Sequence, residues 1–208
     1  MPAIFGTIRL IRMSSGAAAT PEDARFLAAP VPVIAHILAA MLFSLIGAFQ
    51  FPAEARRRWP RAHRIGGRAV LVAGIVVGVS GLWMTAFYEL PAALQGPLLY
   101  AVRVLVGLGM LASLWTAFRA IRRGDIARHR AWMIRAYALG LGAGTQAVLM
   151  LPWSLAFGLP THLPYELLMT LAWLINLAVA ERLIRTRRGR RHGTLSTDLS
   201  IRPVPSVA

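Results

Sequence analysis

The chain has 208 residues, of which 57% are hydrophobic and 15% charged, and its formal net charge is +15 at pH 7. This composition is too apolar for an ordinary water-soluble domain and is typical of a helical membrane protein. The basic residues are all arginine and flank apolar segments, so we expect no nucleic-acid partner. The absence of cysteine excludes disulfides, thiol nucleophiles and zinc–thiolate sites.

Residues 1–28 are expected to form a flexible extension before the first membrane segment. They mix apolar with polar residues and lack the continuous apolar core of a signal peptide. A short membrane-associated helix within this stretch is the alternative. Met13 precedes a polar run and is an alternative start to Met1.

Five apolar segments follow, and each is expected to be a transmembrane helix. Each has about twenty residues, enough to cross about 30 Å of hydrocarbon. In lipid the backbone has to satisfy its own hydrogen bonds, which favours helices. We therefore predict an all-α integral membrane protein, with a five-helix transmembrane domain over residues 29–186. The expected helices are residues 30–51, 69–88, 97–118, 131–151 and 164–184.

The arginines predict the orientation of the bundle. Most of them follow the first, third and fifth apolar segments, on one side of a five-helix protein, whereas the opposite loops have none. The positive-inside rule then places the N-terminus outside and the C-terminus in the cytoplasm, in a bacterial inner membrane. There the arginines are expected to meet anionic lipid headgroups. Residues 187–208 contain serine, threonine and proline and are expected to be a disordered cytoplasmic tail.

Short motifs spread over about residues 25–185 resemble a known family, the bacterial membrane proteins grouped as domain of unknown function 2306. The paired histidine–arginine motifs are the most specific part of the pattern. The resemblance implies a shared membrane fold and no particular reaction. The motifs are Arg25-Phe26, His36, Gln50-Phe51, His63-Arg64, Gly67-Arg68, Ser80-Gly81-Leu82, Arg123-Gly124-Asp125, residues 129–135 (HRAWMIR), Gly144-Thr145-Gln146 and residues 173–181 (WLINLAVAE).

His36 is a candidate ligand-binding residue within the first apolar segment. Steps of three and four residues from it meet small side chains, which mark helix–helix contacts in membranes, so we expect it to point into the bundle. An intramembrane histidine can bind a ligand or metal, or relay a proton. The alternative is a histidine that only forms a hydrogen bond to a neighbouring helix.

His63 and His129 are placed alike, each shortly before an apolar segment on the arginine-rich side. Two histidines from separate helices can hold a haem iron while arginines bind its propionates, so haem b is a candidate cofactor. The alternative is a pair of interfacial histidines whose arginine neighbours contact lipid phosphates. These neighbours are Arg64, Arg68, Arg130 and Arg135.

Arg103 lies inside the third segment, near its outer end. An unpaired arginine at the centre of a membrane helix costs about 2.5–3.5 kcal/mol on insertion scales. We therefore expect a buried ion pair with Glu166, which lies at the same predicted depth. The alternative is a site for an anion or a propionate on the outer side.

The fourth and fifth segments carry the remaining polar candidates. Arg135 and Gln146 are predicted to share a helix face, because steps of four, three and four residues connect them. Glu181 is predicted at the depth of Arg68 and Arg135. An ion pair there would tie the basic hinge to the fifth helix, with proton transfer as the alternative.

Three functions remain open from the sequence. The first is non-catalytic binding of a small ligand, ion or proton by the intramembrane histidine, arginine, glutamate and glutamine set. The second is electron transfer by bound haem b, and the third is a structural or assembly role. The sequence contains no phosphate-binding glycine loop, H-E-x-x-H or G-x-S-x-G motif, so we predict no catalytic residues.

Overall fold

The computed structural model describes residues 2–14 and 24–200, and all regular structure in these residues is helical. Four of the described helices are long and apolar enough to cross a membrane, and a bent pair passes the same test as one span. The expected all-helical, multi-pass fold is therefore confirmed, with four or five crossings. The elements are α1 (Pro2–Ser14), α2 (Ala24–Ala28), α3 (Pro30–Gln50), α4 (Ala53–Arg58), α5 (Pro60–Phe87), α6 (Pro97–Arg122), α7 (Ile126–Gly140), α8 (Gly142–Phe157) and α9 (His162–Ser200).

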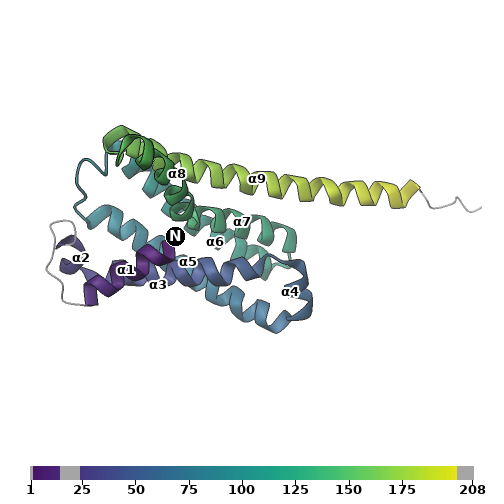
Figure 1. The fold of residues 1–208 in the computed structure, drawn as a ribbon. Coiled ribbons are helices and arrows are strands. Elements are labelled where there is room, and N and C mark those ends of the chain that lie inside the picture. The colour runs from purple at the N-terminus through teal and green to yellow at the C-terminus, as the bar shows by residue number, and fades with distance from the viewer. Residues whose placement is uncertain (1, 15–23, 201–208) are drawn as a thin grey trace, which may run out of the picture.

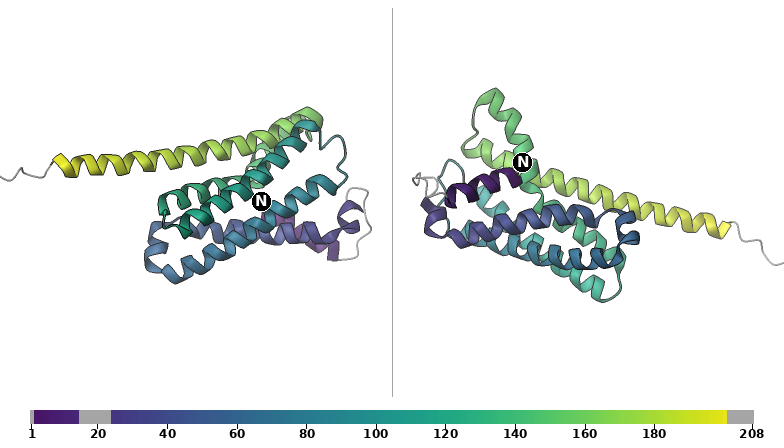
Figure 2. Two further views of the ribbon diagram at one scale, coloured as in Figure 1. Left: turned by 180° about the vertical axis from the view of Figure 1, so that it is seen from behind. Right: turned by 60° about the horizontal axis from the view of Figure 1, so that its bottom comes forward.

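Helices that are neighbours in the chain pack side by side in the bundle (Figures 1 and 2). α3 packs along α5, α5 against α6, α6 against α7, and α9 against both α7 and α8. Phe43 of α3 and Leu114 of α6 are each 1% exposed in the core between them. Gly74 of α5 permits this contact, because an added Cβ would lie 2.8 Å from atoms of both side chains. A small residue thus brings three helices together, as is common in membrane bundles.

α5 begins at Pro60, well before the expected start at residue 69. Proline suits the first turn of a helix, where its fixed φ is already helical and its missing N–H is not needed. Arginine is a good helix former, so the basic stretch continues the helix instead of forming a loop. The arginines and His63 of this stretch are therefore held by a helix that extends into the bundle.

The segment expected to be one helix over residues 131–151 is two helices. α7 starts at Ile126, where the side chain of Asp125 accepts a hydrogen bond from the Arg128 N–H (2.9 Å). α7 and α8 then meet at Leu141 with a bend of 41°. The break coincides with the glycine run at residues 140, 142 and 144, and glycine lowers helix propensity by about 1 kcal/mol relative to alanine.

One end of the bundle gathers most of the basic side chains of the described residues, and we call it the arginine-rich end. It comprises the end of α3, α4, the start of α5, the end of α6 and the start of α7. α9 runs past this end (Figure 1). The opposite end contains the start of α3, the end of α5 and the start of α6.

The structure describes parts of both terminal segments. Residues 2–14 form α1, which packs on α3, and the backbone of α9 continues to Ser200. Residues 1–28 were expected to be a flexible extension, with a short membrane-associated helix as the alternative, and residues 187–208 a disordered tail. Residues 1, 15–23 and 201–208 lie outside the described part of the chain.

Candidate functional site

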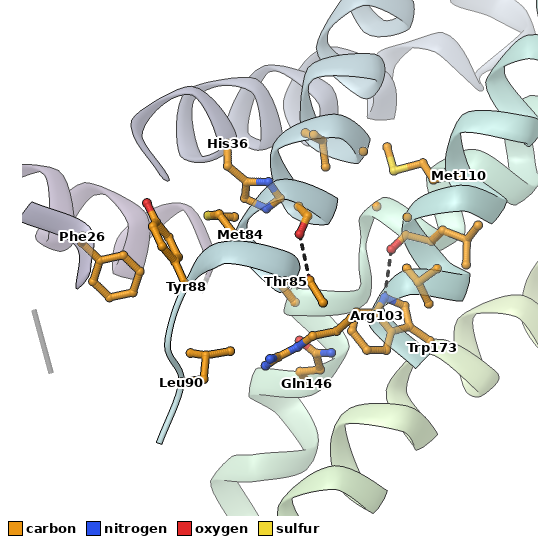
Figure 3. A pocket seen from close by; sticks show the side chains of 18 residues that line it. Phe26, His36, Met84, Thr85, Tyr88, Leu90, Arg103, Met110, Gln146 and Trp173 are labelled. Carbon is orange, nitrogen blue, oxygen red and sulfur yellow. Dashed lines mark hydrogen bonds between the residues drawn. The ribbon is translucent and has the colours of Figure 1, made fainter. Parts of the chain in front are cut away.

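A cavity of about 310 Å³ opens near the opposite end of the bundle and reaches the core between α3, α5, α6, α7 and α8 (Figure 3). Its size is at the lower end of the range of roughly 300–1,000 Å³ that is usual for small-molecule sites. Most of its lining is apolar. The polar side chains that line it include His36, Thr85, Arg103 and Gln146.

His36 enters this cavity from α3, as its sequence position predicted (Figure 3). Its Nδ1 lies 3.0 Å from the Ser80 hydroxyl oxygen, which itself donates to the Val76 carbonyl at 2.5 Å. Because the single hydroxyl proton is used on Val76, the serine oxygen accepts a hydrogen bond from His36 Nδ1–H. In the neutral ring Nε2 then remains as an acceptor. The histidine therefore forms a structural hydrogen bond to α5 at the wall of the cavity.

Arg103 enters the cavity from α6 and donates a hydrogen bond from NH1 to Gln95 Oε1. Among the described residues it forms no direct ion pair with Glu166, although the two interact electrostatically. Glu166 is 6% exposed and accepts instead from the Leu99 N–H at 2.8 Å. The first turn of a helix has free N–H groups and a positive dipole end, which attract the carboxylate. In place of the expected Arg103–Glu166 contact, Arg103 binds the side chains of Gln95 and Tyr165, and Glu166 binds the Leu99 N–H.

The break between α7 and α8 forms part of the cavity wall. Two side chains of α9 bind main-chain carbonyls just before it: Trp173 Nε1 donates to Leu139 at 3.2 Å, and Asn176 Nδ2 donates to Ala138 at 3.0 Å. The Thr145 hydroxyl donates to Asn176 Oδ1 at 2.7 Å. Irregular backbone at membrane depth needs such partners when it lines a cavity. Trp173 and Asn176 were not among the predicted site residues, although both lie in the motif at residues 173–181.

Gln146 and Arg135 lie on opposite sides of the bend at Leu141, and the side chains of both contact α9. Gln146 lines the cavity and its Nε2 lies 3.4 Å from the Met169 carbonyl oxygen. Arg135 lies on the other side of the bend and forms a two-point ion pair with Glu181, with N–O distances of 2.5 and 3.1 Å. Its guanidinium also covers the Trp132 ring at 4.5 Å. The predicted shared face assumed a continuous helix, and the chain bends by 41° at Leu141 between the two residues.

Tyr88 closes the outer part of the cavity, just after the end of α5. Burial raises the pKa of its phenol, so the hydroxyl stays protonated and donates to the Ala29 carbonyl at 2.6 Å. Its ring meets Phe26 edge to face, with centroids 5.3 Å apart. α2 is thereby fixed against the end of α5.

The three candidate histidines lie at two separate places. His36 lines the cavity, whereas His63 and His129 lie at the arginine-rich end, where they interact electrostatically. The Nδ1 of His129 donates to the Ala117 carbonyl at 2.9 Å. No haem site can therefore combine His36 with either of the other two. Arg64 and Arg68 are exposed, and the described residues contain no cluster of three or more metal-ligating side chains.

The comparison with protein families agrees with the fold. The family described as "Predicted membrane protein (DUF2306)" matches residues 33–184, which include most of α3, all of α4 to α8 and most of the apolar part of α9. No curated protein and no solved structure matches the chain. Since the match covers well over half of the chain, the protein belongs to this family of membrane proteins of unknown function.

Proposed function

We propose that the protein is a non-catalytic receptor for a small amphipathic anion, which binds in the cavity beside Arg103. The observation that carries the proposal is a guanidinium that enters a mostly apolar cavity and that no carboxylate of the described residues contacts. A buried charge is costly unless it is paired and hydrogen-bonded. A ligand carboxylate or phosphate would supply that partner.

The donor inventory supports an anion. A guanidinium has five N–H donors in a planar fork, and the hydrogen-bond partners of Arg103 among the described residues are neutral side chains, Gln95 Oε1 at NH1 and Tyr165. The fork matches a carboxylate or a phosphate with two parallel hydrogen bonds. His36 and Gln146 add polar contacts at other points of the wall, while Met110 and Trp173 present apolar surface. A charged head with a short apolar body fits this lining.

The position of the cavity supports access from outside the cell. We propose that α7 and α8 form one bent crossing, which makes five in total, and that the arginine-rich end faces the cytoplasm of a bacterial cell. Arginine-rich helix ends are retained on the cytoplasmic side of the inner membrane. The N-terminus and the cavity mouth near Tyr88 then face outward.

The test is binding of hexanoate to the protein in lipid nanodiscs, with hexanol as the uncharged analogue. Hexanoate is expected to raise the melting temperature of the wild type and to have little effect on Arg103→Gln. Hexanol should have little effect on either protein. Arg122→Gln is the matched control, because it removes the same charge from the exposed end of the same helix.

A second variant covers the case in which Arg103→Gln does not fold. Arg103→Lys keeps the charge but lacks the two-point fork, so hexanoate should stabilise it less than the wild type. Equal stabilisation of all variants by hexanoate, or equal stabilisation by hexanol, would contradict the proposal. The intramembrane histidine, arginine, glutamate and glutamine side chains would then have the structural role that the sequence left open.

A further inference from the structure

Among the described residues, three polar atoms at the arginine-rich end are buried without a hydrogen-bond partner. They are Gln50 Oε1, His63 Nδ1 and Arg130 Nε. Most buried polar atoms in folded proteins have a partner, so each exception calls for an explanation, such as a bound ligand. None of the three belongs to the lining of the cavity described above. They therefore mark a second site.

Helix packing brings the three residues to one place. The side chain of Gln50, the last residue of α3, lies against α5, since a Cβ at Gly66 would be 2.5 Å from Gln50 Nε2. Gly66 is one turn after His63 on the same helix. His63 in turn interacts electrostatically with His129, the residue before Arg130. The orphaned atoms thus come from α3, α5 and α7 where these helices meet.

A further contact fixes α3 against α7 at this level. The rings of Phe51 and Tyr137 lie 4.9 Å apart, next to Gln50. Arg56 of α4 completes the corner, because its NH1 donates to the main-chain carbonyls of Phe51 (2.7 Å) and Gln50 (3.3 Å). Arg56 also interacts electrostatically with His63. The corner is held by packing that does not use the three orphaned atoms.

The described carboxylates at this end are already engaged. Glu54 pairs with Arg57 at 2.6 Å, and Asp125 caps the start of α7. Glu181 pairs with Arg135. Arg56 and Arg130 therefore lie at this corner, and neither forms an ion pair with a carboxylate of the described residues. The electrostatic field of the corner favours an anion.

We infer that Gln50, His63 and Arg130 bind a phosphate group that carries a neighbouring hydroxyl. The phosphate oxygens accept hydrogen bonds from Arg130 Nε–H and from His63 in its Nδ1–H form, and the hydroxyl donates to Gln50 Oε1. This chemistry is that of a phosphatidylglycerol headgroup or of a soluble glycerol phosphate. The residues lie at helix ends, the depth at which headgroups meet a membrane protein. The inference does not depend on the function proposed for the cavity.

The experiment uses the full chain in nanodiscs of phosphatidylcholine alone and of phosphatidylcholine mixed with phosphatidylglycerol. Two quantities are measured: the shift in melting temperature between the two lipids, and the number of phosphatidylglycerol molecules retained in native mass spectrometry. The wild type should melt higher with phosphatidylglycerol and retain it, and Arg130→Gln should lose both effects. Arg128→Gln is the matched control, because it removes an exposed arginine from the same helix turn and should behave like the wild type.

Gln50→Leu is a second variant, for the case in which Arg130→Gln does not fold. It replaces the orphaned amide by an apolar side chain of similar size, so in phosphatidylcholine the protein should be as stable as the wild type or more stable. It should nevertheless lose the shift caused by phosphatidylglycerol. Equal shifts and equal lipid retention in wild type, Arg130→Gln and Gln50→Leu would overturn the inference.

A parallel arm separates the two sources of phosphate. Equilibrium dialysis in detergent, with radiolabelled inorganic phosphate and glycerol 3-phosphate, measures binding without lipid. Retention of phosphatidylglycerol alone assigns the site to a headgroup. Dialysis binding that Arg130→Gln abolishes and Arg128→Gln leaves unchanged assigns it to a soluble phosphate. Binding that both variants leave unchanged counts against the site.

Discussion

Trp173 of α9 donates its indole N–H to the main-chain carbonyl of Leu139 of α7, at 3.2 Å and directly beside the break at Leu141. Asn176, one turn further along α9, binds the preceding carbonyl in the same way. The two side chains supply partners where the helical hydrogen-bond ladder is interrupted. The break in turn places Leu139 and Gly140 in the cavity wall. A structural contact thus determines the shape of the candidate site.

The first prediction concerns this contact. Trp173→Phe keeps most of the ring but removes the donor, and we expect it to reduce the free energy of unfolding by about 1–3 kcal/mol. Trp115→Phe is the control, because Trp115 is 60% exposed and donates no hydrogen bond among the described residues. Thermal unfolding in one detergent compares the two variants. Equal melting temperatures would show that the Leu139 carbonyl does not need its partner.

The second prediction concerns the glycine opposite the same indole. A Cβ at Gly142 would overlap Trp173 Nε1 and its neighbouring ring atoms. Gly142→Ala should therefore destabilise the protein by about 1–3 kcal/mol, as overpacking in a core does. Gly109→Ala is the control: its nearest neighbour would lie at 3.7 Å, and alanine raises helix propensity. If Gly142→Ala is as stable as Gly109→Ala, the close approach of α8 and α9 is not required.

The third prediction concerns the Arg135–Glu181 ion pair. The two side chains are 25% and 35% exposed, so water screens part of their attraction. A double-mutant cycle with Arg135→Gln and Glu181→Gln should give a coupling energy of about 0.5–1 kcal/mol. Chemical unfolding in mixed micelles measures the four proteins. Strictly additive effects would mean that the pair contributes nothing to holding α7 against α9.

The fourth prediction contrasts this pair with Arg103 and Glu166. Because these side chains bind different partners, the cycle of Arg103→Gln and Glu166→Gln should show weaker coupling than the Arg135–Glu181 cycle. Glu166→Gln alone should cost about 0.3–2 kcal/mol, because a charge at the start of α6 is lost. A larger coupling energy than that of Arg135 and Glu181 would restore the direct ion pair expected from the sequence.

The fifth prediction concerns orientation. A fluorescent reporter that folds only in the cytoplasm, fused after Arg191, should be bright, and alkaline phosphatase at the same position should be inactive. The physical reason is the retention of arginine-rich helix ends inside the cell. An active phosphatase would reverse the orientation, or would mean that α7 and α8 together do not cross the membrane.

Several features could be predicted because they depend on local composition. Apolar runs of sufficient length showed where α3, α6 and α9 cross, since the hydrocarbon core requires that length of any chain. The short motifs identified the family, which the match over residues 33–184 confirms. The small residues near His36 indicated that its side chain points inward, and the cavity contains it.

Other features depend on which helix faces which, and only the tertiary structure decided them. Glu166 binds the Leu99 N–H at the start of α6 and not the side chain of Arg103. The sequences of the two helices do not show that these two groups compete for the carboxylate. The bend at Leu141 separates Gln146 from Arg135, whereas a periodic pattern assumes an unbroken helix. Packing of α3, α5 and α7 gathered Gln50, His63 and Arg130 at one corner, far from His36. The amino-acid sequence alone thus determined the spans and the family, since those follow from hydropathy and motif. The partners of each buried polar group followed from geometry that exists only once the helices have packed.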